Sequence, residues 1–119
     1  MNRIVVSLGL LAVVACNSPT EPLGVLAAPP SLKLTNPSDA SIYYFIVERV
    51  YAARINWGPC ANPRTCAAVP PHATSTVPYD DIGGYAPGAK EAIVYWWHLM
   101  PRGGTRFEPD SIRGIVVQL

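Results

Sequence analysis

Side chains that could act as acids, bases or nucleophiles are scattered along this 119-residue chain rather than gathered into a motif. The candidates are Asp80, Asp81, His72, His98, Ser75 and Ser111. The spacings G-x-S-x-G, S-x-x-K and H-E-x-x-H, which place a nucleophile, a base or metal ligands together, do not occur in the sequence. The adjacent carboxylates of Asp80 and Asp81 would usually face water, and two acids alone are weak grounds for calcium. We therefore expect a protein that is not an enzyme and that uses no metal and no cofactor.

The three cysteines divide into Cys16 near the N-terminus and the pair Cys60 and Cys66. In an oxidising compartment the pair would close a short loop, and that closure would stabilise the fold by about 2 kcal/mol. A zinc site that joins the pair to His72 and His98 is the alternative, but the spacing matches no zinc-finger pattern. The spacing also differs from the two-residue separation of thioredoxin-like redox motifs. We predict a structural disulfide.

The N-terminal segment is organised as a secretory signal peptide, with Arg3 followed by an apolar stretch over residues 4–15. A membrane-spanning helix would need about 20 apolar residues, so this stretch is too short to span. The run Val13-Val14-Ala15-Cys16 resembles the processing site of bacterial lipoproteins, in which two aliphatic or small residues and Gly, Ala or Ser precede the cysteine. The resemblance implies cleavage before Cys16 and a diacylglycerol, with acyl chains such as palmitate, on its sulfur.

Lipidation at Cys16 would place the protein in the cell envelope, because each acyl methylene buried in the membrane contributes about 0.8 kcal/mol. Asn17 follows the cysteine, where an Asp would indicate retention in the inner membrane of some Gram-negative bacteria. We therefore expect an outer-membrane anchor, facing either the periplasm or the cell surface. Cleavage near Ala15 by an ordinary signal peptidase is the alternative.

We divide the chain into a signal peptide over residues 1–15, a lipidated cysteine and flexible tether over 16–30, and a domain over 31–119. Four prolines make the tether a poor helix or central strand. Removing Arg3 with the leader leaves eight basic and eight acidic residues, from nine and eight in the whole chain. Nucleic-acid binding normally needs a clustered basic excess, so we exclude that class.

Residues 31–119 are rich in β-branched and aromatic runs, separated by Pro, Gly and Asn, and show no sustained helical period. This pattern predicts an all-β domain, an immunoglobulin-like Greek-key sandwich of about six to eight strands. The expected strands cover residues 32–35, 42–50, 53–57, 74–77, 89–99 and 112–119. The sequence Asn-Pro-Ser-Asp at 36–39 predicts a turn, and Trp57 is expected to anchor the core.

The run Tyr95-Trp96-Trp97-His98 carries the strongest functional signal, because strand alternation puts its two tryptophans on opposite faces. One tryptophan should be buried, while the other would form a flat platform that stacks on sugars or packs against a protein. The alternative is a tryptophan covered by a loop or by the stem of an arginine. The candidate binding surface consists of Tyr43, Tyr44, Trp96 and His98.

Residues 31–119 resemble the single immunoglobulin-like domains of small bacterial envelope lipoproteins, through Leu34-Thr35-Asn36, the segment 57–66 and the aromatic run at 95–98. The resemblance implies the sandwich fold but supplies no activity. We therefore expect a lipid-anchored, non-catalytic envelope protein whose partners are the membrane and an envelope protein or glycan. The competing hypotheses are an accessory subunit of an envelope complex with no ligand of its own, and a hydrolase or metal-binding protein.

Overall fold

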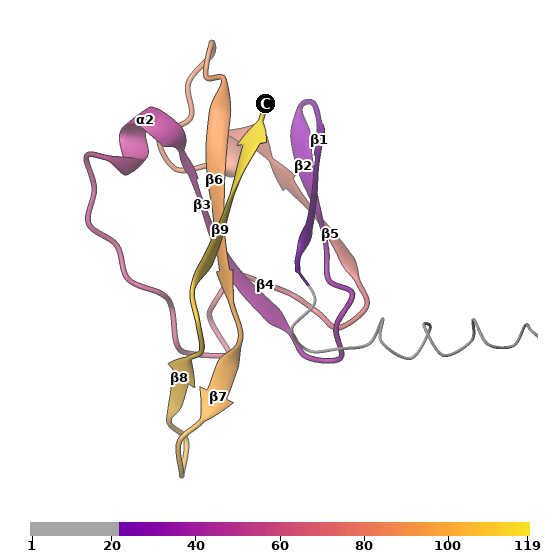
Figure 1. The fold of residues 1–119 in the computed structure, drawn as a ribbon, viewed down its shortest axis with the longest axis vertical. Helices are drawn as coiled ribbons and strands as arrows, with labels where there is room; N and C mark the ends of the chain where they lie inside the picture. The colour runs from indigo at the N-terminus through magenta and orange to yellow at the C-terminus, as the bar shows by residue number, and fades with distance from the viewer. Residues whose placement is uncertain (1–21) are drawn as a thin grey trace, which may run out of the picture.

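The computed structural model describes residues 22–119, which form nine strands, one short helix and one 3-10 turn (Figure 1). The elements are β1 (Gly24–Ala28), β2 (Ser31–Thr35), β3 (Ile42–Glu48), α2 (Arg49–Ala52), β4 (Ala68–Val69), β5 (Thr74–Pro78), η2 (Tyr79–Asp81), β6 (Glu91–Trp97), β7 (Leu99–Pro101), β8 (Phe107–Pro109) and β9 (Arg113–Gln118). The predicted all-β class is confirmed. The described residues contain one strand more than the upper bound of the prediction.

Two antiparallel sheets form the sandwich, with strand orders β1-β2-β5 and β4-β3-β6-β9. The chain crosses between the sheets after β2, after β4 and after β5, which is a Greek-key arrangement. This order matches the immunoglobulin arrangement, in which the A, B and E strands face the C, F and G strands. A third sheet, the β7–β8 hairpin, extends beyond the end of the sandwich (Figure 1).

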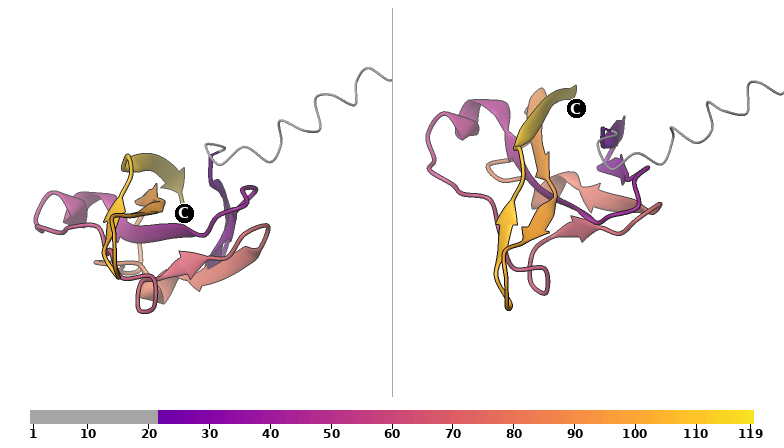
Figure 2. Two further views of the ribbon diagram at one scale, coloured as in Figure 1. Left: turned by 90° about the horizontal axis from the view of Figure 1, so that it is seen from below. Right: turned by 60° about the horizontal axis from the view of Figure 1, so that its bottom comes forward.

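Figure 2 shows the two sheets from two further sides. The core lies between the sheets and follows the two-residue period of each strand. Leu32, Leu34 and Val77 point inward from the three-stranded sheet. Their counterparts on the four-stranded sheet include Ile46 and Val94, which are paired in register. Each fully buried side chain of this kind contributes about 1.5–3 kcal/mol, so these inward faces hold the sheets together.

The strand that follows the turn ends earlier than predicted. Glu48 accepts hydrogen bonds on its carboxylate from the backbone N–H groups of Val50 and Tyr51, at 3.0 and 2.8 Å. This capping starts α2 where the sequence predicted a continuing strand. The predicted strand over residues 53–57 is therefore wrong, because this segment leaves α2 as an irregular loop.

The domain begins before residue 31, because residues 24–28 of the predicted tether form β1. This strand pairs antiparallel with β2 along its whole length, from Gly24 opposite Thr35 to Ala28 opposite Ser31. Val25 and Ala27 pack against the core while Leu26 points outward, which is the alternation of a half-buried strand. The predicted signal segment and Cys16 lie outside the described residues. Within residues 22–119, no helix is long and apolar enough to cross a membrane.

Candidate functional site

Three of the four residues in the predicted binding surface are buried. Tyr43, Trp96 and His98 expose only 8%, 2% and 7% of their surface, and Tyr44 alone is half-buried. Trp96 faces the core, and the guanidinium carbon of Arg113 lies 4.6 Å from the centre of its ring. A ring enclosed in this way offers no face to a ligand. The prediction is therefore corrected: Trp96 is the tryptophan covered by an arginine.

Three other half-buried aromatic rings lie on the face of the four-stranded sheet that is directed away from the core, opposite to Trp96. Phe45 on β3 and Tyr95 on β6 are paired in register, and Trp57 from the loop after α2 packs against both. The ring centres of Trp57 lie 4.8 Å from Phe45 and 4.7 Å from Tyr95. We call Phe45, Trp57 and Tyr95 the outer aromatic cluster. Trp57 is thus a surface residue of this cluster and not the predicted core anchor.

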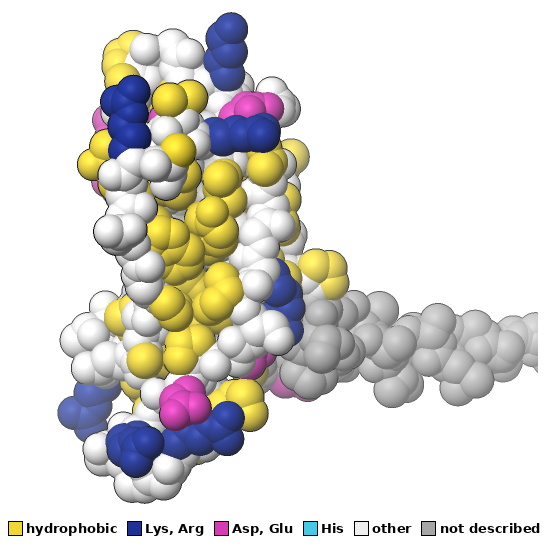
Figure 3. Space-filling view, turned by 60° about the vertical axis from the view of Figure 1, so that its left-hand side comes forward, with side chains coloured by type: hydrophobic (Ala, Val, Ile, Leu, Met, Phe, Trp, Pro, Cys, Tyr) yellow, Lys and Arg dark blue, Asp and Glu magenta, His cyan; other side chains and the backbone are white. Residues whose placement is uncertain are grey.

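Hydrophobic side chains form a band down the middle of this face, and Lys and Arg side chains gather at its two ends (Figure 3). Below the cluster, Trp97 is almost fully buried, with its ring centre 6.0 Å from that of Trp57. Val116 on the edge strand β9 is exposed on the same side of the sheet as Tyr95. The centre of the face is therefore apolar and partly accessible, as a surface for stacking or docking requires.

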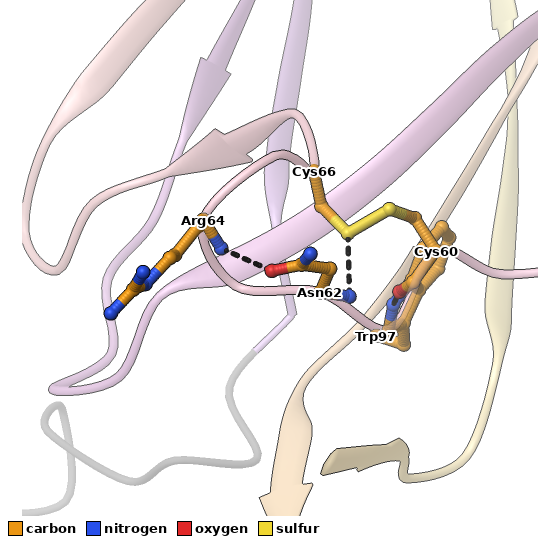
Figure 4. The surroundings of a disulfide bond; sticks show 5 residues. All are labelled: Cys60, Asn62, Arg64, Cys66 and Trp97. Atoms are coloured by element: carbon orange, nitrogen blue, oxygen red, sulfur yellow. Dashed lines mark hydrogen bonds between the residues drawn. A yellow bond between two sulfur atoms is a disulfide. The ribbon is translucent and has the colours of Figure 1, made fainter. Parts of the chain in front are cut away.

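The disulfide holds the loop that carries Trp57 against the sheet. Cys60 and Cys66 are bonded, as predicted, with their Cα atoms 5.7 Å apart (Figure 4). The indole N–H of Trp97 donates to the carbonyl oxygen of Cys60 at 3.0 Å. Inside the ring, Asn62 accepts a hydrogen bond on its side-chain oxygen from the N–H of Arg64 at 2.9 Å. Sequence alone predicted the covalent bond, but the Trp97 contact depends on the fold.

The disulfide also removes the thiolates that the alternative zinc site would need. His72 contacts Asp39 at the surface, and His98 lies near Asp110, so the two histidines have different neighbours. Among residues 22–119, no three Cys, His, Asp or Glu side chains are grouped as metal ligands. The structure therefore brings together none of the sets of metal ligands that the sequence offered.

His98 belongs to a buried polar cluster that sequence reasoning missed. Its Nδ1 lies 3.4 Å from Oδ2 of Asp110, and its backbone N–H donates to Oδ1 of the same residue at 2.8 Å. Arg113 reaches Oδ2 of Asp110 at 3.5 Å. The other ring nitrogen of His98 has no hydrogen-bond partner among the described residues. A pairing of His with Asp orients an imidazole, and within residues 22–119 no serine or cysteine side chain is hydrogen-bonded to His98. Through Asp110, the cluster joins the end of β6 to the start of β9.

Tyr44 lines a cleft of about 370 Å³ between β3 and β5. Burial raises the pKa of the Tyr44 hydroxyl, and the nearby negative charge of Asp81 adds to this effect. The hydroxyl therefore stays protonated at neutral pH and would serve a ligand as a neutral hydrogen-bonding group. Asp80 and Asp81 lie in η2, and both are exposed.

A larger cleft, of about 830 Å³, separates the disulfide loop from the tip of the β7–β8 hairpin. We call it the basic cleft, because two arginines line it together with polar and aromatic groups. Its lining includes Asn62, Pro63, Arg64, Thr105, Arg106, Phe107 and Glu108, so two positive side chains and one negative side chain face the cleft. Nothing in the sequence spacing placed residues 61–64 beside residues 104–108. Their proximity follows from the disulfide loop and the hairpin meeting at one end of the sandwich.

Comparison with known proteins gives this chain no relative: no protein-family model, no curated protein and no solved structure matches it.

Proposed function

We propose that this protein is a non-catalytic envelope lipoprotein that binds a protein or a glycan through the outer aromatic cluster. The observation that carries the binding role is the half-buried state of Phe45, Trp57 and Tyr95 on a face whose middle is apolar. Aromatic rings left partly in water by a folded domain can bury further area on a partner at little entropic cost, since each has two rotatable bonds.

The geometry of the cluster favours stacking. Opposite Tyr95, the edge strand β9 carries Gly114, and a Cβ atom at that position would come within 3.4 Å of the tyrosine ring. The glycine therefore lets the ring of Tyr95 lie close against the backbone of β9. Trp57 is tilted by 44° to Tyr95 and by 32° to Phe45, and its ring centre lies 4.7 and 4.8 Å from theirs, so Trp57 packs against both rings. Aromatic clusters of this kind suit the flat faces of sugar rings or the apolar centre of a protein interface.

The proposed anchor rests on the processing site that ends in Cys16, and two properties of the described domain agree with it. The Cys60–Cys66 disulfide suits a protein exported to an oxidising compartment. The folded domain begins with the buried Leu23, a few residues after the cysteine. We favour the outer membrane as the site of the anchor.

Intact-mass analysis of the membrane fraction tests the anchor directly. We expect a chain that begins at Cys16, carries acyl chains and is two hydrogens lighter than its reduced form. An unacylated mature chain would contradict the anchor and leave the binding role to be tested separately.

The binding role is tested by enrichment on envelope glycans and by crosslinking in cells. Replacing Trp57 with Ala should weaken whichever interaction is found by about thirtyfold, because a central aromatic anchor is worth about 2 kcal/mol or more. Leu26→Ala is the matched control, since Leu26 is an exposed apolar residue on the other sheet. Near-UV circular dichroism from the buried Trp96 and Trp97 would report that the variants remain folded. Equal binding by both variants, or no specific enrichment at all, would refute the role of the cluster.

A further inference from the structure

One end of the sandwich combines positive charge with exposed apolar side chains. The β7–β8 hairpin projects from this end, and its tip carries Arg102 and Arg106. The disulfide loop adds Arg64 across the basic cleft. Glu108 pairs with Arg102 at 2.9 Å, whereas Arg64 and Arg106 make no ion pair within residues 22–119. Two guanidinium groups at this end therefore have no carboxylate partner within the described residues and are available to an external anion.

The same end exposes apolar side chains that are not part of the core. Met100 on β7 and Ile112, just before β9, are both exposed, and Phe107 on β8 is half-buried. Arginines beside exposed Met, Ile and Phe side chains form the combination found in segments that lie in the headgroup region of a membrane. A soluble anion would use the charges but would leave the apolar groups without a role.

The position of this end relative to the anchor supports a membrane as the partner. β1 starts at its lower end in the view of Figure 1, on the three-stranded sheet, and the β7–β8 hairpin projects downward beyond the four-stranded sheet (Figure 1). The six residues from Asn17 to Pro22, fully extended, reach about 20 Å. A lipid on Cys16 would therefore hold the hairpin end within reach of the headgroups, while the opposite end of the 60 Å molecule points away.

We propose that Arg64, Arg106 and the hairpin tip bind the phosphate groups of anionic phospholipids in the membrane that holds Cys16. The proposal rests on the anchor given under the proposed function. Guanidinium groups suit phosphate because they donate two parallel hydrogen bonds. The disulfide fixes Arg64 on one side of the cleft while the hairpin presents Arg106 on the other. Docked in this way, the domain stands on its hairpin end and the outer aromatic cluster faces sideways, clear of the lipid.

A fluorescent label at the hairpin tip tests the docking. In the anchored chain Cys16 is acylated and the other two cysteines are bonded, so Thr105→Cys supplies a single free thiol. The labelled protein, extracted from membranes, is placed in vesicles of phosphatidylcholine with or without phosphatidylglycerol, each containing a headgroup quencher. We expect quenching at this position in the anionic vesicles and its loss at high salt. Ala86→Cys, in the loop that precedes β6 at the opposite end, is the control and should stay unquenched.

Arg64→Gln together with Arg106→Gln should lower the ratio of docked to undocked protein about thirtyfold, which corresponds to about 1 kcal/mol for each arginine. An unchanged ratio, or equal quenching in neutral vesicles, would overturn the proposal. Displacement of the hairpin by soluble glycerol phosphate at low concentration would assign the arginines to a free phosphate ester instead of a membrane. The mass of the same preparation shows whether the anchor is present, so an acylated chain without quenching refutes the docking alone.

Discussion

Asn36 shows how much a single polar side chain organises in this domain. It is fully buried at the end of β2, and its Nδ2 lies 2.8, 3.0 and 3.1 Å from the carbonyl oxygens of Ala40, Val69 and Pro70. Its Oδ1 accepts hydrogen bonds from both the backbone N–H and the hydroxyl of Ser38, at 2.9 and 2.7 Å. One amide thereby ties the turn after β2 to the segment that follows β4.

Replacing Asn36 with Ala should destabilise the domain by about 3 kcal/mol or more, because buried carbonyl groups on two separate segments would lose their donor. Ser38→Ala should cost about 1 kcal/mol, since the backbone N–H of Ser38 still satisfies the asparagine oxygen. Urea denaturation of both variants measures the difference. Equal losses would show that Asn36 acts only as a turn former.

The residue types predicted the turn at 36–39 but not the hydrogen bonds at its centre, because the carbonyl groups that Asn36 satisfies come from residues 40, 69 and 70. The aromatic residues give a similar lesson. Alternation correctly separated Trp96 from Trp97, yet both are buried. Which face of a sheet stays open depends on what the rest of the chain lays over it, here Arg113 on one side and the Cys60 loop on the other.

At the scale of elements, α2 depends on a glycine in the loop before β6. Gly84 has a φ of +73°, and a Cβ atom built there would lie 2.3 Å from Cγ of Tyr51, the third residue of α2. The backbone of the loop therefore packs directly on the tyrosine ring. Gly88 has a φ of +95° but has nothing within 4 Å of its Cβ position.

Gly84→Ala should therefore destabilise the domain by about 1–3 kcal/mol more than Gly88→Ala. Both variants force alanine into the left-handed region, at a cost of about 1–2 kcal/mol, and Gly84→Ala adds the displacement of Tyr51. Thermal unfolding of the two variants gives the comparison. Adding Tyr51→Ala to Gly84→Ala should restore part of the lost stability, because the smaller side chain leaves room for the new Cβ atom. Additive effects of the two substitutions in this double-mutant cycle would count against the contact.

Three elements also meet at Glu91, the first residue of β6. Its carboxylate accepts hydrogen bonds from Gln118 of β9 at 2.6 Å and from Arg49 of α2 at 2.8 Å. The hydrogen bond from Gln118, followed by that from Arg49, lowers the pKa of Glu91 below its usual value of 4.5. A carboxyl whose pKa falls on folding stabilises the native state above its unfolded pKa.

The contribution of Glu91 should therefore be complete above about pH 5 and disappear as the pH falls through the lowered pKa. Glu91→Gln removes this dependence, so the stability difference between the two proteins should shrink toward zero in acid. The measurement is the urea midpoint of each protein over a series of pH values. A difference that does not change with pH would exclude the ionised carboxylate as its source. High salt should reduce the difference at neutral pH, because the pair is exposed.

The elements that could be predicted are the strands with enough β-branched, aromatic or alternating side chains of their own. The predicted strands at 32–35, 42–50, 74–77, 89–99 and 112–119 correspond to β2, β3, β5, β6 and β9, although β3 and β6 are shorter than predicted. β4, β7 and β8 have only two or three residues each and depend on their partners for their conformation, so the local pattern could not reveal them. The predicted strand at 53–57 is wrong because this segment pairs with no other strand. Its aromatic residue, Trp57, instead packs from a loop on side chains of β3 and β6.

At the scale of the whole molecule, the position of the domain boundary decides how far the sandwich stands from its anchor. The prolines of residues 16–30 predicted a tether throughout this segment. In the structure the buried Leu23 precedes β1, which completes the three-stranded sheet. β1 also lies beside β9, so the N-terminal strand links the edges of both sheets. The shorter tether that remains is what brings the hairpin end close to the proposed membrane.

Two leucines of this segment distinguish a folded strand from a tether. Leu23 exposes 3% of its surface and packs in the core, whereas Leu26 exposes 63%. Leu23→Ala should lower the free energy of unfolding by about 2–4 kcal/mol, because it removes buried methyl groups and leaves a cavity. Leu26→Ala should change it by less than about 0.5 kcal/mol. Chemical denaturation of the full chain compares the two variants. Equally small effects would show that residues 22–28 belong to the tether and not to the domain. The tether would then be longer, and the geometric reason for the hairpin to contact the lipid would be lost.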